Sequence, residues 1–183
     1  MRGSAWGTRD ERVQSFGYLA AMRQEPIDYI ARTRDQYSAL GYPVYSWVEN
    51  TDAPPFVRPE RPPPEWKVGL VASGGIYALG QPAFHFKDDL SFRAIATDAD
   101  VSDLRVTHFA YDLTDAREDP NVVLPLDPLR RLASAGEIGG LGANAYTFMG
   151  GIYSARKVRD VLAPAIADHL ENDEVDVALM VPV

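Results

Sequence analysis

The residues best suited to chemistry stand together in LRVTHFAYD, at positions 104–112. His108, which titrates near neutral pH, precedes Tyr111 and Asp112, and these two side chains could orient the histidine or a substrate. Near the carboxyl end of a strand, His108 could act as a general acid toward a leaving amine, or position the substrate. Taken alone, these residues slightly favour a half-buried histidine with a structural hydrogen bond.

A second group of candidates follows the apolar run VGLVAS. The main-chain N–H groups of Ser73, Gly74 and Gly75 could cradle a carboxylate, although a plain strand-to-loop turn is slightly favoured. In DDLSFR, Arg93 is the best candidate for clamping a substrate carboxylate, because its planar guanidinium matches two oxygens. An ordinary ion pair is the alternative for Arg93. The segment SGGIYALG fits neither glycine-rich nucleotide-binding pattern, so it carries little support for a nucleotide site.

Metal binding and cysteine chemistry find little support. The acidic residues after Tyr111 lack the order of a calcium loop, so a solvated loop with local capping is favoured and no metal site is expected. These residues are Asp112, Asp115, Glu118 and Asp119. None of the 183 residues is a cysteine, which excludes a disulfide and a cysteine nucleophile within this sequence.

Composition narrows the classes of partner. The formal net charge of -8 disfavours nucleic acid. No apolar run approaches the roughly 18–20 residues of a membrane span, and the start, MRGSAWGTRDER, has no apolar segment typical of a secretory signal. We therefore expect a cytoplasmic protein that binds neither nucleic acid nor membrane.

The elements that must position these residues divide the chain at 66/67. Residues 1–66 are expected to hold a helix at 26–41 and a proline-rich segment at 50–65. This segment is interpreted either as an arm that lies over the main body or over a partner subunit, or as a surface linker. Residues 67–183 are expected to form a three-layer α/β domain, Rossmann- or flavodoxin-like, with a mostly parallel sheet flanked by helices. The expected strands are 68–73, 104–112, 121–127 (strand or extended), 145–151 and 175–183, and the expected helices are 128–135 and a long one from Ser154 that Pro164 kinks or restarts.

The last predicted strand, VDVALMVPV, runs to Val183. In open α/β sheets, ligands and catalytic groups gather beyond the carboxyl ends of strands, so a residue following Val183 would stand where chemistry usually occurs. A plain edge strand is an equally good interpretation from the pattern alone. If the strand is buried, an interface would be expected to cover it, and an oligomer is expected.

Three segments resemble the glycine/sarcosine/betaine/D-proline reductase selenoprotein B family. They are VGLVASGGIYALGQPAF, the long block from DDLSFR to AYTFMG, and VDVALMVPV, which together span about Lys67 to Val183. The long block contains H-x-x-Y-D-x-x-D-x-x-x-D-x-N followed by a PLD-x-L-R turn, a pattern that is distinctive. The first 66 residues are less diagnostic.

The resemblance implies reductive cleavage of a C–N bond beside a carboxylate, by a selenocysteine or cysteine nucleophile. In the family, that residue directly follows a strand like VDVALMVPV, so the chain is expected to stop one position short of it and to be inactive alone. The resemblance also implies a pyruvoyl group on a partner subunit and a small amino-acid-like substrate. It makes a catalytic and a structural role for His108 equally good interpretations.

Two other classes of function stay open. A non-catalytic α/β module could use the same edge to bind a small carboxylate or hold a partner subunit. A flavodoxin-like nucleotide binder is a weaker third possibility.

Overall fold

A computed structural model describes residues 28–44 and 48–183, and the chain divides into two compact units, residues 1–51 and 52–183. In the first unit, helix α2 (Tyr29–Ala39) begins where the Asp28 carboxylate accepts a hydrogen bond from the Ala31 N–H at 2.9 Å. It ends just before Gly41, whose φ of +76° suits glycine. The predicted helix is therefore confirmed over the described residues, while its expected start at Pro26 lies outside them.

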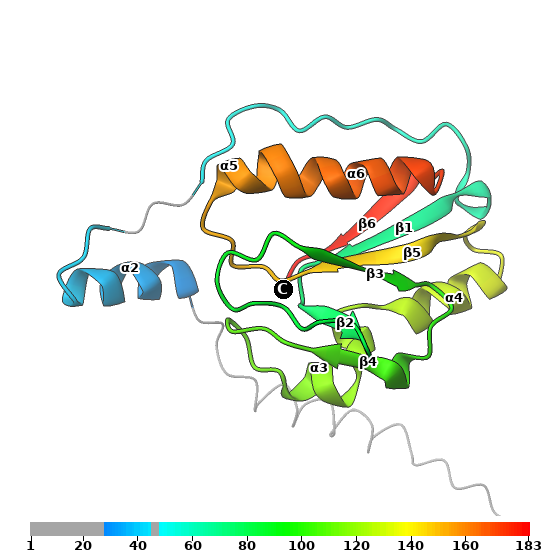
Figure 1. Cartoon of the computed structure of the whole chain (residues 1–183). Coiled ribbons are helices and arrows are strands. Elements are labelled where there is room, and N and C mark those ends of the chain that lie inside the picture. Colours follow the sequence, from blue (N-terminus) through cyan, green and yellow to red (C-terminus); the bar gives the residue numbers. More distant parts are fainter. Residues whose placement is uncertain (1–27, 45–47) are drawn as a thin grey trace, which may run out of the picture. The chain divides into compact units, whose positions relative to one another are not determined.

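The second unit is built on a four-stranded sheet of order β3-β5-β1-β6 (Figure 1). The central strand β1 pairs in parallel with both β5 and β6, and β3 pairs with β5 in the antiparallel sense. The bounds are β1 (Lys67–Ala72), β3 (Phe92–Ala96), β5 (Gly140–Phe148) and β6 (Val177–Val181). The predicted α/β class with a mostly parallel sheet is confirmed, although β3 was not predicted.

Alternate side chains of each strand point to opposite faces of the sheet. Each face therefore has its own hydrophobic core, and helices cover both. Leu70 on β1 and Ala145 on β5 enter one core, and Val71 and Tyr146 enter the other. Helix α6 lies over the second core, with α4, α3 and a small ribbon of β2 and β4 on the opposite side of the sheet (Figure 1). These elements are β2 (Ile76–Ala78), β4 (Leu104–Val106), α3 (Thr114–Glu118), α4 (Leu126–Ser134) and α6 (Ala163–Asn172).

Two predicted strands are wrong in extent or type. The strand expected over 104–112 ends at Val106, where β4 pairs with β2, so the chain continues as a loop and His108 lies beyond the strand. The segment 121–127, expected as strand or extended chain, forms a 3-10 turn at Pro120–Val122 and the start of α4. Apolar character was read as strand in both places, whereas Val123, Leu124 and Leu126 enter the core from turn and helix.

The last helix does change its winding near Pro164, as expected. Ser154 caps a short helix α5 (Ala155–Lys157), a π-helical turn follows at Val158–Leu162, and α6 then begins with the proline in its first turn. Proline is tolerated there because the first N–H groups of a helix lack intrahelical acceptors.

The final strand β6 lies at the edge of the sheet, and in these residues it is not buried. Its side chains Leu179 and Met180 are 39% and 59% exposed. The expectation of a buried strand is therefore wrong for this chain, because β6 has one neighbouring strand instead of two.

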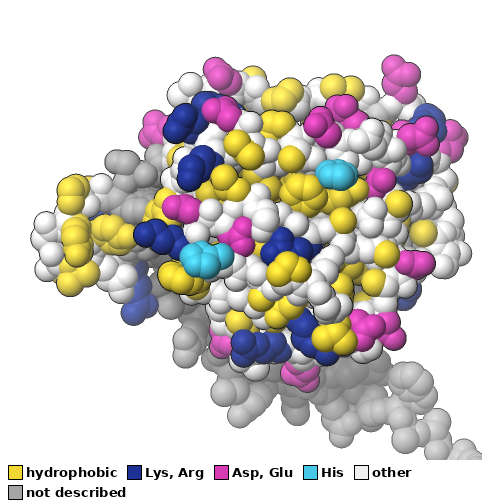
Figure 2. Space-filling view, viewed as in Figure 1, with side chains coloured by type: hydrophobic (Ala, Val, Ile, Leu, Met, Phe, Trp, Pro, Cys, Tyr) yellow, Lys and Arg dark blue, Asp and Glu magenta, His cyan; other side chains and the backbone are white. Residues whose placement is uncertain are grey.

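The surface of the second unit mixes both signs of charge. In the face shown in Figure 2, acidic and basic side chains are interspersed, consistent with the modest net charge of -8. None of the described helices is long and apolar enough to cross a membrane.

Candidate functional site at the carboxyl edge of the sheet

The carboxyl ends of β1, β5 and β6 are joined by main-chain hydrogen bonds into one edge. Ser73 donates its N–H to the Val181 carbonyl at 3.1 Å, and its own carbonyl accepts from the Gly150 N–H at 3.0 Å. The Gly75 N–H donates to the Phe148 carbonyl at 3.0 Å. Two of the three amides predicted to cradle a carboxylate are therefore already used within the sheet. The cradle stays a prediction that these bonds do not support.

Gly75 brings the His108 loop to this edge. Its carbonyl accepts a hydrogen bond from the Thr107 N–H at 3.0 Å, and its φ is +70°. A Cβ at position 75 would lie 2.0 Å from the Thr107 carbonyl oxygen, so the two main chains can approach this closely only with glycine there. Gly75 thus fixes the position of Thr107 and of the residue that follows it, His108.

His108 is buried, with 8% of its surface exposed, and the main chain sets its orientation. Its Nδ1 accepts a hydrogen bond from the Ala110 N–H at 3.0 Å. Since an amide can only donate, Nδ1 carries no proton and the neutral ring bears its proton on Nε2. Burial lowers the pKa of His108 below its ordinary value of 6.5, which favours this neutral form.

The Nε2 atom of His108 is a buried donor that has no hydrogen-bond partner among the described residues. It lies beside Gly150, where a built Cβ would lie 3.4 Å from Nε2 and 3.6 Å from Ser73 Cβ. Leaving a buried donor unsatisfied costs about 1–3 kcal/mol, so such atoms call for an explanation. The structure thus leaves an unused N–H next to Gly150 at the carboxyl edge.

Aromatic side chains support the imidazole. The Phe109 ring stacks on it with a centroid distance of 5.5 Å, and the Tyr111 ring lies 4.7 Å away. The Tyr111 hydroxyl donates to the Gly74 carbonyl at 2.8 Å, and burial raises the pKa of this hydroxyl. Tyr111 therefore joins the His108 loop to the glycine turn.

Residues after β6 lie at the same edge. The Val183 N–H donates to Ser73 Oγ at 3.0 Å, and a Cβ built on Gly74 would lie 3.4 Å from the Val183 side chain. A groove of about 240 Å³ beside them is lined by Val71, Ser73, Phe148, Met180, Val181 and Pro182. The structure therefore brings Ser73, Gly74, His108 and Tyr111 together with the chain that leaves β6.

The two other predicted site residues have contacts of a different kind. Asp112 is exposed and accepts hydrogen bonds from the Thr114 hydroxyl at 2.7 Å and N–H at 2.9 Å, which lower the pKa of its carboxyl. Arg93 donates from Nε to the Pro82 carbonyl at 2.9 Å, and its guanidinium lies 4.3 Å from the centre of the Phe84 ring. Asp112 thus stabilises the turn into α3, and Arg93 holds the loop before β3. A catalytic role for Asp112 and carboxylate binding by Arg93 stay predictions.

Gly150 is a part of this edge that was not predicted from the sequence. Gly150 could have been found from the Gly150-Gly151 pair directly after the strand-like AYTFM. A glycine pair at a strand's carboxyl end often marks close backbone approach. The bond from Val183 to Ser73 Oγ carries no recognisable sequence pattern.

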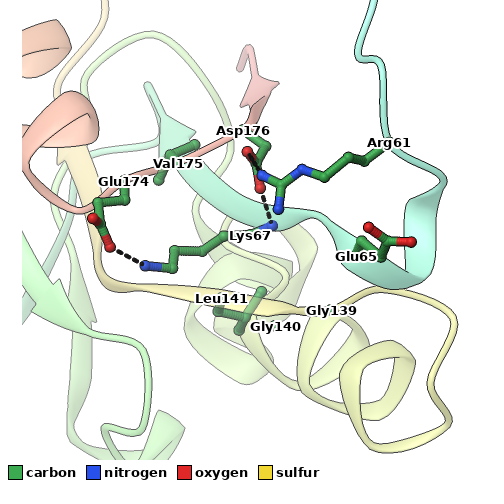
Figure 3. A pocket seen from close by; sticks show the side chains of 9 residues that line it. All are labelled: Arg61, Glu65, Lys67, Gly139, Gly140, Leu141, Glu174, Val175 and Asp176. Carbon is green, nitrogen blue, oxygen red and sulfur yellow. Dashed lines mark hydrogen bonds and ion pairs between the residues drawn. The ribbon is translucent and has the colours of Figure 1, made fainter.

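A larger cavity of about 680 Å³ lies at the opposite, amino-terminal edge of the sheet (Figure 3). Its charged side chains are largely engaged with one another: Arg61 pairs with Asp176, and Lys67 Nζ lies 3.3 Å from the Glu174 carboxylate. Asp176 also accepts from the Lys67 N–H at 2.8 Å. These contacts attach the proline-rich segment to the start of β1 and β6, so we interpret the cavity as structural. Within the described residues, no group of three or more His, Asp or Glu side chains could hold a metal ion.

The fold defines an open α/β protein, and in such sheets ligands generally bind beyond the carboxyl ends of the parallel strands. A sequence profile of the family "glycine/sarcosine/betaine reductase selenoprotein B" matches residues 64–182, which include every candidate residue from Ser73 to Gly150. The chain belongs to this family, and the resemblance noted from its motifs is confirmed.

Two curated proteins are similar to this chain. One is the D-proline reductase subunit gamma of Acetoanaerobium sticklandii, 36% identical over 132 residues, which cover 67% of this chain and 54% of that protein. The other is the glycine reductase complex component B subunit gamma of Symbiobacterium thermophilum, 34% identical over 119 residues, covering 62% of this chain and 28% of that protein. The chain thus spans about half of one relative and less of the other. No solved structure matches it significantly.

Proposed function

We propose that this chain forms part of a reductase subunit that cleaves a C–N bond of an amino-acid-like substrate, of the glycine, betaine, sarcosine or proline type. The nucleophile is a selenocysteine or cysteine in the segment that follows β6. The observation that carries this proposal is the hydrogen bond from Val183 to Ser73 Oγ, which directs the chain leaving β6 along the edge where His108 lies. The names of the two relatives support the reaction class.

The edge suits such a nucleophile chemically. A selenol or thiol that has lost its proton attacks the carbon beside the carboxylate, and the amine leaves with the electrons of the broken C–N bond. An anion of this kind needs nearby donors and few negative charges. His108 Nε2 is such a donor, and the remaining surroundings are the main chain of Ser73 and Gly150 with the rings of Phe109 and Tyr111.

The residues of this chain have distinct proposed roles. His108 and Ser73 form the floor beside the nucleophile, and Tyr111 fixes the His108 loop against Gly74. We assign Arg93 and the amides of Ser73 and Gly75 to the scaffold, because their donors already meet carbonyl oxygens. We further propose a cytoplasmic complex in which a partner subunit supplies a pyruvoyl group that activates the substrate amine.

The test is the composition and activity of the native protein. The nucleotide sequence after Val183 should continue in frame through a TGA or a cysteine codon, followed by codons for Cys and His. Protein purified from its own organism should then be heavier than the 20.2 kDa of these 183 residues and contain selenium or reactive cysteine. With its partner subunit and a dithiol as reductant, it should cleave the C–N bond of one of the four substrate types, which releases an amine from a glycine, betaine or sarcosine type and opens the ring of a proline type.

Two controls separate the alternatives. The 183-residue chain by itself has no cysteine and should release no amine. A native protein of 20.2 kDa without selenium would instead support the non-catalytic module, and the reductase proposal would be abandoned.

A further inference from the structure

We infer that His108, held as the Nε2–H tautomer, is a positioning residue that donates a hydrogen bond to the anionic nucleophile and keeps it deprotonated. The inference rests on the proposed function, and it assigns His108 a role different from general acid toward the leaving amine. Three observations carry it: the fixed tautomer, the unused donor and the residues that lie beside that donor.

The tautomer is fixed by the main chain. The Ala110 N–H donates to Nδ1 at 3.0 Å, so Nδ1 must keep its lone pair and the ring proton resides on Nε2. An imidazole held in this way can donate from Nε2 at any pH at which it is neutral. Protonation at Nδ1 would break this hydrogen bond, so His108 is poorly suited to store a second proton for the amine.

The Nε2–H group of His108 makes no hydrogen bond among the described residues. His108 Nε2 is buried without a partner among the described residues, while the polar atoms around it are bonded elsewhere: the Ser73 carbonyl accepts from Gly150, and Ser73 Oγ accepts from Val183. An unused N–H inside an otherwise satisfied network indicates an acceptor that these residues do not supply. A negatively charged acceptor gains most from such a donor, because the donor is buried.

The residues beside the donor favour the nucleophile over a substrate carboxylate. A Cβ built on Gly150 would lie 3.4 Å from Nε2 and 3.6 Å from the Ser73 Cβ, and Ser73 Oγ accepts a hydrogen bond from the Val183 N–H. Gly150 and Ser73 therefore link the donor to the chain that leaves β6, which is where the proposed function puts the nucleophile.

The test measures the pH at which half of the nucleophile is ionised, from the rate of alkylation by iodoacetamide in the full-length protein. His108→Leu removes the donor and should raise this midpoint by about one pH unit, the usual worth of a hydrogen bond to a charged group. His108→Gln retains an N–H near the Nε2 position and should keep most of the wild-type midpoint. The matched control is His85→Leu, since His85 is exposed and its hydrogen bonds to Lys87 and Asp89, within the described part of the chain, lie outside the site.

A second variant leaves the histidine in place. Gly150 does not have a positive φ, so Gly150→Ala is compatible with the backbone, and its methyl group would lie 3.4 Å from Nε2. This methyl should shield the donor and raise the midpoint in the same direction as His108→Leu. Circular dichroism establishes that both variants are folded.

The outcomes separate this inference from the proposed function. A wild-type protein that iodoacetamide does not label would overturn the reductase proposal itself. Normal labelling with an unchanged midpoint in both His108→Leu and Gly150→Ala would overturn the inference and leave the reductase standing. A raised KM with an unchanged midpoint would also overturn it, because the donor would then serve the substrate carboxylate. A raised midpoint with KM nearly unchanged is the expected result.

Discussion

Two glycines with nearly the same backbone angle show how surroundings decide the importance of a residue. Gly75 and Gly136 have φ values of +70° and +73°. A Cβ on Gly75 would strike the Thr107 carbonyl, whereas one on Gly136 would meet nothing within 4 Å. The first glycine is required by contact with another segment, and the second only by its own conformation.

We therefore expect Gly75→Ala to destabilise the protein by more than about 3 kcal/mol, since the His108 loop must move to relieve the overlap. Gly136→Ala should lose about 1–2 kcal/mol, the conformational term alone. Urea unfolding of the two variants measures the difference. Equal losses would show that the approach of Thr107 to Gly75 is not tight in solution.

His108 should make stability depend on pH. Burial lowers the pKa of His108, so the unfolded chain binds its proton more readily than the folded one. This contribution to stability is complete above the unfolded pKa of about 6.5, and it is lost as the pH falls from there through the folded pKa. Comparison of urea midpoints between about pH 8 and about pH 5 should show a slope that His108→Gln reduces. The Asp112 carboxyl, whose pKa is lowered by hydrogen bonds from Thr114, acts only below about pH 4 and cannot account for that slope.

Among the elements, the helix before β6 depends on its π-helical turn. The extra residue in this turn sets Val158, Leu162, Ile166 and Leu170 at intervals of four, toward the sheet. Leu162 is 2% exposed, while its neighbour Val161 is 53% exposed. A regular helical period would put both side chains on one apolar face, because it cannot anticipate an inserted residue.

Leu162→Ala should therefore destabilise the protein by about 2–4 kcal/mol, and Val161→Ala by less than about 0.5 kcal/mol. Chemical denaturation followed by circular dichroism is sufficient to distinguish them. Similar values for both would place the π-helical turn elsewhere in the helix.

The elements also show how far sequence patterns reach. Apolar runs with glycine at their ends identified β1, β5 and α4, because burial on both faces leaves a strong pattern. The short strands β2 and β3 were missed, since three to five residues give too little alternation. Ser73, His108 and Tyr111 were found from residue type and proximity to strand ends. The position of Val183 beside Ser73 and that of Nε2 beside Gly150 could not be predicted, because they depend on contacts between distant segments.

At the scale of the molecule, the proline-rich segment belongs with the α/β body. Arg61 pairs with Asp176, its carbonyl accepts from the Trp66 indole at 2.6 Å, and Gly139 packs against the main chain around Glu65. The core residues all come from the body itself. The boundary predicted at 66/67 and the unit that begins at residue 52 thus make different predictions for truncation.

A chain beginning at Asp52 should retain the unfolding free energy of the full 183 residues to within about 1 kcal/mol. A chain beginning at Lys67 should lose about 2 kcal/mol or more, mainly from the apolar contacts of half-buried Trp66. Thermal and urea unfolding of both truncated chains measure this. Equal stability of the two would support the boundary at 66/67.

The hydrogen bond from Ala110 to His108 Nδ1 has a consequence for variation within this family. The donor belongs to the peptide group, so nineteen of the twenty standard amino acids at position 110 would supply it equally well, and proline alone would not. Most substitutions at position 110 should therefore leave the orientation of the imidazole unchanged. A homologue with proline at the position of Ala110 would be expected to carry something other than histidine two residues earlier.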